Sequence, residues 1–202
     1  MSAKSFAVLI VLAGFAATGR AQVNDVSVTV GRTFISTQTV QGTNLPLHFG
    51  SEETVAFNYG RFLMRRHIFG LTAELPVAIV PVTDLTYHLG GVPTDIGSLF
   101  ITPSARVNIF AGEDVSPWVS IGGGYGHFRT SEHLLYGGTN PASPTNTGVL
   151  QFGVGMDVWI FPKWGARLEA RDFYSGIPDY DVDTGRSRQH NYYVGVGVIH
   201  RF

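Results

Sequence analysis

The 202-residue sequence contains no cysteine. This absence excludes a disulfide framework, and it excludes a lipid-modified N-terminus because that modification is made on a cysteine. Charged residues are also scarce, at 14% of the chain, and their formal net charge is −1. Proteins that bind nucleic acid carry a basic patch or excess. We therefore expect no nucleic-acid partner.

Long apolar runs are missing after residue 21, and the one before it is short. Lys4 supplies a basic start, residues 6–17 form an apolar and small-residue run, and small residues flank Arg20. The run is shorter than the roughly 20 residues that a membrane-spanning helix needs. The pattern is typical of a cleavable export signal. We predict a signal peptide at residues 1–21 and a single mature domain at residues 22–202.

Removal of the signal peptide makes the chain slightly more acidic. It takes away Lys4 and Arg20, which leaves 12 basic residues against 15 acidic ones and a net charge of −3. The mature chain is instead rich in glycine, with 25 in the whole sequence, and in aromatics, at 12%. Such a composition suits many short strands joined by tight turns.

The mature chain alternates between apolar and polar or small residues in segments of about ten, as the strands of a membrane barrel do. From Leu150 to Ile160, even positions are apolar, while odd positions include Gln151 and Asp157. In the last segment, alternate residues from Tyr192 to Val198 are apolar. With boundary errors of two to four residues, we predict eight strands: 26–36, 54–63, 68–80, 98–110, 117–129, 148–161, 165–174 and 190–202. Arg32 breaks the alternation in the first predicted strand, and a β-bulge there would explain the break.

The connections between these segments alternate in length. Long links span residues 37–53, 81–97, 130–147 and 175–189, and short ones span 64–67, 111–116 and 162–164. Outer-membrane barrels have short periplasmic turns and long extracellular loops. The sequence therefore predicts an all-β fold, a closed antiparallel eight-stranded transmembrane β-barrel with long extracellular loops and short periplasmic turns.

Aromatic residues gather near both ends of the predicted strands. Membrane barrels carry aromatic girdles at their two interfaces, so we interpret these residues as two belts. The belt near the short turns would contain Phe62, Phe110, Trp118, Phe161 and Trp164, and the belt near the long links Phe34, Tyr87, Tyr125, Phe128, Phe173, Tyr174 and Tyr192.

Three segments resemble the small outer-membrane β-barrel family, which contains the OmpA transmembrane domain and OmpX: residues 117–126, 164–172 and 193–202. The resemblance covers nearly the whole mature chain and implies a bacterial outer-membrane location. It also implies that a terminal Phe202, preceded by Val194, Val196 and Val198, is an assembly signal for the barrel-assembly machinery. His200 departs from that pattern.

Six charged residues fall on the predicted inward face: Glu74, Arg106, Asp157, Arg167, Glu169 and Arg171. An eight-stranded barrel is just wide enough for side chains to fill it, and charges held inside should be paired. The set contains three charges of each sign, which favours a structural salt-bridge core over an ion path. We expect Asp157 among the three residues from strand 165–174, with Arg106 or Glu74 reaching across the lumen.

Other reactive side chains form no motif that we recognise. His127, Ser131, Glu132 and His190 would be candidates for a hydrolase, which requires a nucleophile beside an oriented base. The acidic run 179–183 lacks the glycine and the distal glutamate of the known calcium loop. We therefore predict no catalytic site, no metal site and no cofactor.

The favoured function is a non-enzymatic structural or surface-interaction barrel acting through its outer loops. The alternatives are a small-solute channel and a lipid A-modifying hydrolase. We expect a monomer that contacts outer-membrane lipid and lipopolysaccharide, with an extracellular ligand as an option.

Overall fold

The computed structural model describes residues 24–43, 45–88, 91–139 and 144–202. The predicted signal peptide lies outside these residues. Strands dominate the described part of the chain, and none of it forms a helix that is long and apolar enough to cross a membrane.

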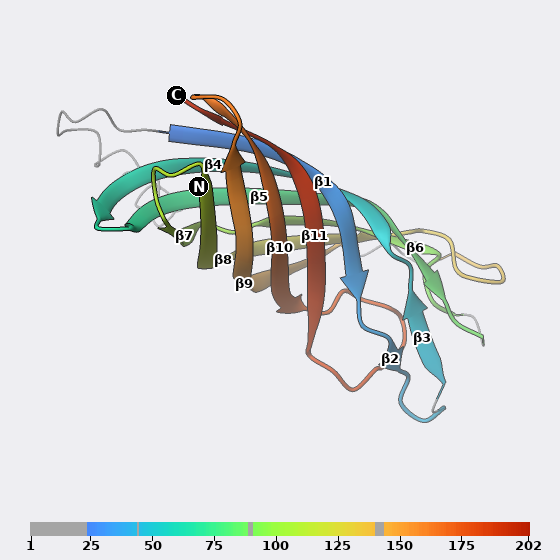
Figure 1. Ribbon diagram of the computed structural model, residues 1–202. Helices are drawn as coiled ribbons and strands as arrows, with labels where there is room; N and C mark the ends of the chain where they lie inside the picture. Colours follow the sequence, from blue (N-terminus) through green and yellow to red (C-terminus); the bar gives the residue numbers. More distant parts are fainter. Residues whose placement is uncertain (1–23, 44, 89–90, 140–143) are drawn as a thin grey trace, which may run out of the picture.

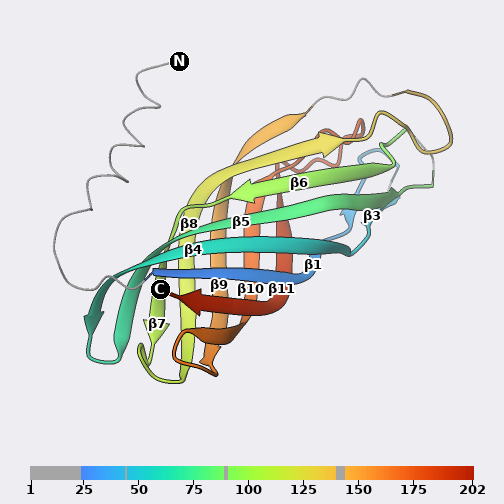
Figure 2. The same cartoon turned by 90° about the horizontal axis from the view of Figure 1, so that it is seen from above.

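Eight strand positions form a closed antiparallel ring, as the sequence predicted (Figures 1 and 2). The ring closes because β1 pairs with both β4 and β11. One position is shared by two shorter strands, β6 and β7, which both pair with β5 and β8. The wall strands are β1 (Asn24–Ile35), β4 (Glu52–Arg66), β5 (Phe69–Thr86), β6 (Asp95–Ile101), β7 (Ser104–Ile109), β8 (Val115–Thr130), β9 (Thr145–Trp159), β10 (Trp164–Gly176) and β11 (Arg188–Arg201).

The links alternate in length as predicted, so the barrel has a turn end and a loop end (Figure 2). The turn end carries the connections at 67–68, 110–114 and 160–163. Asn24 and Phe202 also meet there, where each main-chain N–H donates to the other's carbonyl at 2.9 Å. The long link between β1 and β4 contains two short strands that the sequence did not reveal, β2 (Gln38–Thr39) and β3 (Pro46–Phe49). Which end faces the cell exterior stays a prediction.

The break between β6 and β7 lies where prolines of adjacent strands come together. Pro76 and Pro103 have no N–H to give to the ladder. Thr102 N–H donates to the Pro76 carbonyl at 3.1 Å, and Gly123 N–H donates to the Pro103 carbonyl at 3.2 Å. Gly122 on β8 lies against this break, and a Cβ there would come within 2.4 Å of the Pro103 carbonyl oxygen. The glycines of β8 thus admit the close approach of the interrupted strand.

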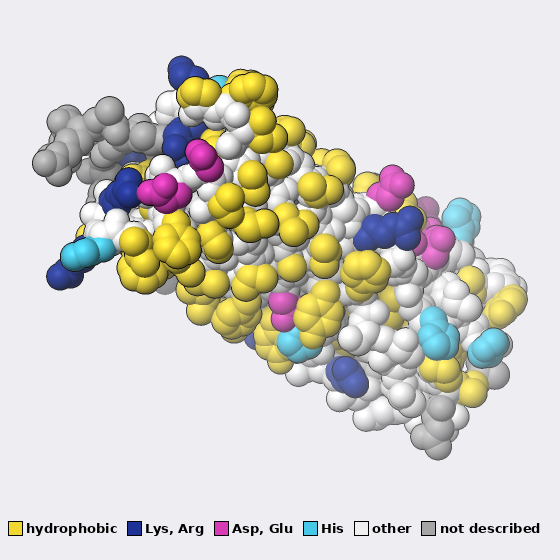
Figure 3. Space-filling model, in the orientation of Figure 1, with side chains coloured by type: hydrophobic (Ala, Val, Ile, Leu, Met, Phe, Trp, Pro, Cys, Tyr) yellow, Lys and Arg dark blue, Asp and Glu magenta, His cyan; other side chains and the backbone are white. Residues whose placement is uncertain are grey.

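The two faces of the wall have opposite chemistry. Exposed apolar side chains cover the outside, including Val194, Val196 and Val198 of β11. Figure 3 shows hydrophobic side chains over the middle of one wall, with most charged side chains toward its two ends. The inward side chains instead include many buried polar and charged residues. A sheet that is apolar outside and polar inside is typical of a transmembrane barrel.

The aromatic belts are confirmed only in part. Phe110, Phe161 and Trp164 are exposed beside the turns, and Phe34, Tyr125 and Tyr192 are exposed toward the loops. The assignment was wrong for Trp118, Phe128, Phe173 and Tyr87, which are buried. Three of these occupy inward positions of their strands, and Tyr87, in the loop after β5, packs in the buried apolar cluster. Whether such a side chain is buried depends on the face of the sheet to which it belongs, and not on how near it lies to the end of its strand.

The first strand needs no bulge. β1 keeps one continuous register with both neighbours, and Arg32 points outward near the loop end, where its Nη1 donates to Ser51 Oγ at 3.3 Å. Register shifts occur elsewhere, between Phe62 and Met64 and between Val80 and Thr83. The second shift changes which side chains of β5 face inward: Val80 is buried before it, and Thr83 and Leu85 after it.

Candidate functional site: the filled lumen and its mouth

All six charged residues predicted to face inward are buried inside the barrel. Four of the eight strand positions contribute them: Glu74 from β5, Arg106 from β7, Asp157 from β9, and Arg167, Glu169 and Arg171 from β10. Because neighbouring inward residues on β10 are two positions apart, they stack along the barrel axis. The structure adds a seventh charge, Asp25 of β1, which is 8% exposed.

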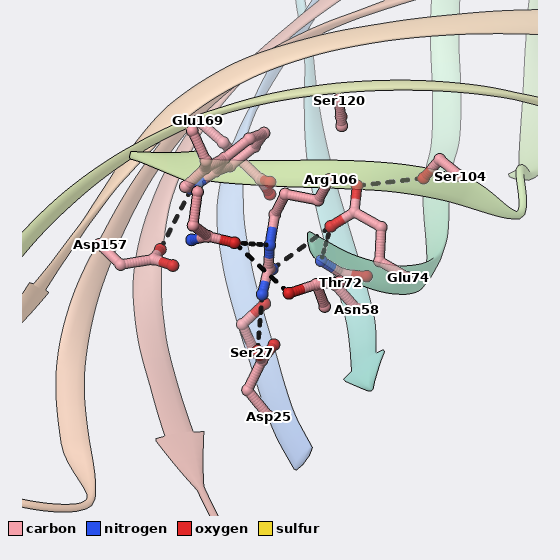
Figure 4. A network of polar contacts seen from close by, with 12 residues as sticks. Asp25, Ser27, Asn58, Thr72, Glu74, Ser104, Arg106, Ser120, Asp157 and Glu169 are labelled. Carbon is pink, nitrogen blue, oxygen red and sulfur yellow. Dashed lines mark hydrogen bonds and ion pairs between the residues drawn. The ribbon is translucent and has the colours of Figure 1, made fainter. Parts of the chain in front are cut away.

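Five of these charges form one chain of contacts across the lumen. Arg171 donates from Nε to Glu169 Oε2 and from Nη1 to Glu74 Oε1, both at 2.9 Å. Arg106 donates to the other oxygen of Glu74 at 3.3 Å and to Asp25 Oδ2 at 2.6 Å (Figure 4). Glu74 on β5 and Arg171 on β10 lie four ring positions apart in both directions around the barrel. They are therefore on opposite sides of the wall, and their contact crosses the lumen.

The lumen chain also uses neutral partners. Asn58 and Ser104 donate to Glu74 at 3.0 and 3.1 Å, and Thr29 donates to Glu169 at 2.6 Å. A buried carboxylate needs several donors to offset the loss of water. Glu74 therefore receives hydrogen bonds from four side chains.

The remaining two charges form a separate bidentate pair. Arg167 and Asp157 are direct cross-strand neighbours, and the guanidinium donates to both carboxylate oxygens, at 2.7 and 2.8 Å. Arg167 also donates to Ser27 at 3.1 Å. The expectation that Asp157 would lie among all three β10 residues was too broad, because Arg171 pairs instead with Glu169 and Glu74.

Trp118 joins the two groups of charges. Its ring lies 5.1 Å from the Arg171 guanidinium, 5.3 Å from that of Arg167 and 5.9 Å from that of Arg106. Its Nε1 donates to Asp157 at 3.3 Å. Cations over an aromatic face are attracted by the ring quadrupole. A residue that we assigned to the membrane interface is thus the centre of the lumen network.

A small cavity lies on the turn side of the network. It has a volume of about 190 Å³, and Asp25, Arg106, Trp159 and Arg201 are among the residues that line it. The Arg201 guanidinium lies 3.8 Å from the centre of the Trp159 ring. The network of charged side chains therefore separates this cavity from the rest of the lumen.

On the loop side of the charges, an apolar layer crosses the lumen. Phe100 stacks on Phe173 with ring centres 4.8 Å apart and meets the edge of Phe128 at 5.7 Å. Tyr193 belongs to the same buried cluster, and its hydroxyl donates to Thr29 at 2.8 Å. Phe173 follows Arg171 by two residues on β10, so the aromatic layer lies directly above the charged one.

The loops cover the mouth of the barrel. Val40 and Leu47 from the link between β1 and β4, Val92 from the next long link, and Tyr180 from the last are all buried in the apolar cluster. The Tyr180 hydroxyl donates to Gln189, and burial raises the pKa of Tyr180 well above its ordinary value. The phenol therefore stays protonated and continues to donate.

The acidic run 179–183 closes on itself. Asp179 accepts a hydrogen bond from Asp181 N–H at 3.1 Å, and Asp183 accepts one from Gly185 N–H at 2.7 Å. Partial burial and the neighbouring Asp179 raise the pKa of Asp181. Within residues 24–43, 45–88, 91–139 and 144–202, no group of three or more His, Asp and Glu side chains is arranged to hold a metal ion.

The candidates for hydrolase chemistry do not meet. The ring of His127 contacts Asn146 at 2.7 Å, whereas the Ser131 hydroxyl contacts Thr94 and the main chain of His133. His190 contacts Asp172 at 2.7 Å on the outer wall. Among the described residues, no serine or threonine hydroxyl bonds to either histidine ring. His190 thus has a carboxylate beside its ring, and within the described part of the chain no hydroxyl group is hydrogen-bonded to it.

The four residues of the predicted assembly signal are exposed: Val194, Val196 and Val198 on the outer face of β11, and Phe202 directly after this strand. His200, which departs from the pattern, lies on the same face between two aromatic rings, 4.2 Å from Trp164 and 6.1 Å from Phe202 between ring centres. It thus extends an aromatic stack at the turn end.

Comparisons with known proteins identify the fold. No protein-family model and no curated protein match the sequence. Among solved structures, the outer membrane protein AlkL in lipid bilayers superposes with a TM-score of 0.61 at 13% identity, covering 93% of each chain. Neisserial surface protein A gives 0.58 at 13% identity, covering 89% of this chain and 97% of its own.

The attachment invasion locus protein Ail of Yersinia pestis, solved with the heparin analogue sucrose octasulfate, gives a TM-score of 0.51 at 14% identity, covering 91% of this chain and 100% of its own. Likeness at this level of identity concerns fold. The chain has the fold of the small bacterial outer-membrane β-barrel proteins, as the sequence predicted.

Proposed function

We propose that this protein is a non-enzymatic outer-membrane barrel that does not conduct solutes and that meets its partners through its outer loops. The observation that carries the proposal is the filling of the lumen by two successive layers, one of paired charges and one of aromatic rings. A conducting barrel needs a continuous polar path, whereas the Phe100–Phe173 stack lies across this lumen.

Conductance in planar bilayers tests the closed lumen. We expect no discrete current steps from the folded parent or from Phe152→Ala, a control in which an exposed aromatic side chain of the outer wall is removed. Heat-modifiable gel mobility would verify that both are folded. Steady conductance steps from the folded parent would overturn the proposal and favour the channel.

The charge of the loops indicates the chemistry of a partner. The long links between the wall strands, residues 36–51, 87–94, 131–144 and 177–187, carry four carboxylates and one arginine: Glu132, Asp179, Asp181 and Asp183 against Arg186. A surface of one sign steers partners of the other sign. Although Ail was solved with a sulfated sugar, the acidic loops here favour a cationic partner.

Binding of fluorescent oligolysine and of sucrose octasulfate to the purified barrel tests this step. We expect salt-sensitive binding of oligolysine and none of the octasulfate. Asparagine at positions 179, 181 and 183 should weaken oligolysine binding while keeping the side-chain oxygens that accept the turn hydrogen bonds. The control, Glu113→Gln with Asp114→Asn at the turn end, should leave binding unchanged. Equal binding of oligolysine by both variants, or a preference of the parent for the octasulfate, would contradict the proposal that the acidic loops bind a cationic partner.

A further inference from the structure

Large apolar side chains cover most of the outer wall, but one part of this wall contains a groove. Its volume is about 470 Å³, and it lies across β8 to β11. Val154 and Val194 flank Ala170 as its direct cross-strand neighbours, and the small side chain of Ala170 lowers the wall between them. Phe152 and Tyr192 flank the next outward residue on β10, Asp172, in the same way.

Polar residues continue from the loop end of this groove. Asp172 Oδ2 lies 2.7 Å from His190 Nδ1, and the His190 ring stacks on Tyr192 at 5.4 Å and contacts Tyr174 at 4.7 Å. Two residues further along β11, the exposed Arg188 guanidinium lies 5.6 Å from the Tyr174 ring centre. An apolar groove, a histidine and an arginine thus follow one another along the strand direction.

The depth of these residues matches a membrane interface. Trp164, exposed at the turn end, precedes Tyr174 by ten residues on the same strand. At about 3.3 Å per residue and a tilt of about 40°, ten residues rise about 25 Å, which is the height of the apolar band of such barrels. Tyr174 and its cross-strand neighbour His190 therefore lie at the far interface, and Arg188 lies in the headgroup region.

A carboxylate on the lipid-facing wall is costly and calls for a functional explanation. Asp172 holds the His190 ring next to the groove. Arginine is suited to phosphate because its planar group donates two parallel hydrogen bonds.

We propose that the groove binds an acyl chain of a phosphate-bearing membrane lipid, whose phosphate contacts Arg188 and His190. The bilayer is the phase that faces this wall, so the occupant is a lipid rather than a soluble ligand. The site is independent of whether the lumen conducts.

Native mass spectrometry of the detergent-solubilised barrel tests the site, with dimyristoylphosphatidic acid, dimyristoylglycerol and inorganic phosphate as probes. We expect the parent to retain one phosphatidic acid and neither of the other probes. Arg188→Gln should weaken this binding about tenfold, as expected for loss of a charge-assisted hydrogen bond. Ala170→Phe fills the groove and should weaken it similarly with the arginine intact. The control Arg186→Gln removes a nearby loop charge and should bind as the parent does.

Several outcomes would overturn the proposal. Equal binding of phosphatidic acid by the parent, Arg188→Gln and Ala170→Phe would remove both halves of the site. If dimyristoylglycerol bound as tightly as phosphatidic acid, the phosphate contact would make no contribution to binding. If inorganic phosphate bound as tightly, the groove would make none. A dimer that Ala170→Phe dissociates would show that a second copy of the chain occupies the groove. Heat-modifiable mobility of each variant separates these results from misfolding.

Discussion

At the scale of single residues, the aromatic side chains of the lumen depend on glycines beside them. Trp118 on β8 faces Gly155 on β9, and a Cβ at Gly155 would lie 2.3 Å from its ring. Tyr193 bears the same relation to Gly195 on its own strand, where a Cβ would come within 2.0 Å of the hydroxyl. The glycine content of the chain is thus partly a packing requirement, since large rings lie flat against the inner wall only where the neighbouring position has no side chain.

We therefore expect Gly155→Ala to destabilise the barrel by about 1–3 kcal/mol, the usual cost of overpacking. Gly148→Ala is a matched control on the same strand, since nothing lies within 4 Å of a Cβ there. Unfolding in urea, followed by tryptophan fluorescence, would measure both. Equal midpoints for the two variants would show that Trp118 can move away without cost.

The contact between Arg171 and Glu74 makes a second prediction at this scale. Arg171→Met leaves Glu74 buried with one cation fewer, which typically costs about 3–5 kcal/mol for a fully buried pair. Glu74→Gln in the same chain should recover part of the loss. A double-mutant cycle in urea measures the coupling, and Arg66→Met, at an exposed turn-end arginine, controls for the loss of a positive charge. A coupling energy near zero would contradict the filled lumen.

Much of the lumen could be predicted from side-chain alternation, and two errors show how. Asp25 shares a face with Ser27 and Thr29, so extending the first predicted strand by one residue would have included it. Phe173 shares a face with Arg171 and Ser175, so alternation places it inside. We instead assigned it to an interface because it lies near a strand end.

At the scale of elements, side-chain alternation predicted all eight strand positions, and the alternating link lengths predicted the hairpin topology that joins them. The sequence did not predict the shift between Val80 and Thr83 or the break at Pro103. Both irregularities depend on which residues of the neighbouring strand lie opposite a proline. The alternation pattern of a single strand does not contain this information.

Link length also predicts orientation, and this is testable at the level of one loop. A protease-cleavable tag inserted after Gly138, beside Asn140, should be cut on intact cells, whereas one at Glu113 should be protected. Gly138 and Glu113 are both exposed, so burial does not explain a difference. Asn140 itself lies outside the described residues. Cleavage at Glu113 alone would reverse the assignment of outside and inside.

At the scale of the whole molecule, closure of the ring determines which inward residues meet. The pairing of Arg167 with Asp157 follows from one hairpin and was within reach of the sequence. The contact of Arg171 with Glu74 depends on the tilt and stagger of all eight strand positions, because these determine which residues share a level across the lumen. No local pattern contains that information. The sequence therefore predicted that inward charges would pair across the lumen, but not that Arg171 would pair with Glu74.

Phe202 has two structural features that variants can separate. Phe202 exchanges two main-chain hydrogen bonds with Asn24, and its side chain is exposed on the outer wall beside His200. Deleting Phe202 should reduce insertion into the membrane, measured as the yield of heat-modifiable barrel. Phe202→Ala keeps the main-chain bonds, so an equal loss in this variant would assign the effect to the aromatic side chain, as an assembly signal requires. Phe161→Ala removes another exposed turn-end aromatic and should insert normally. Parental yield from both Phe202 variants would show that assembly reads some other feature of the last strand.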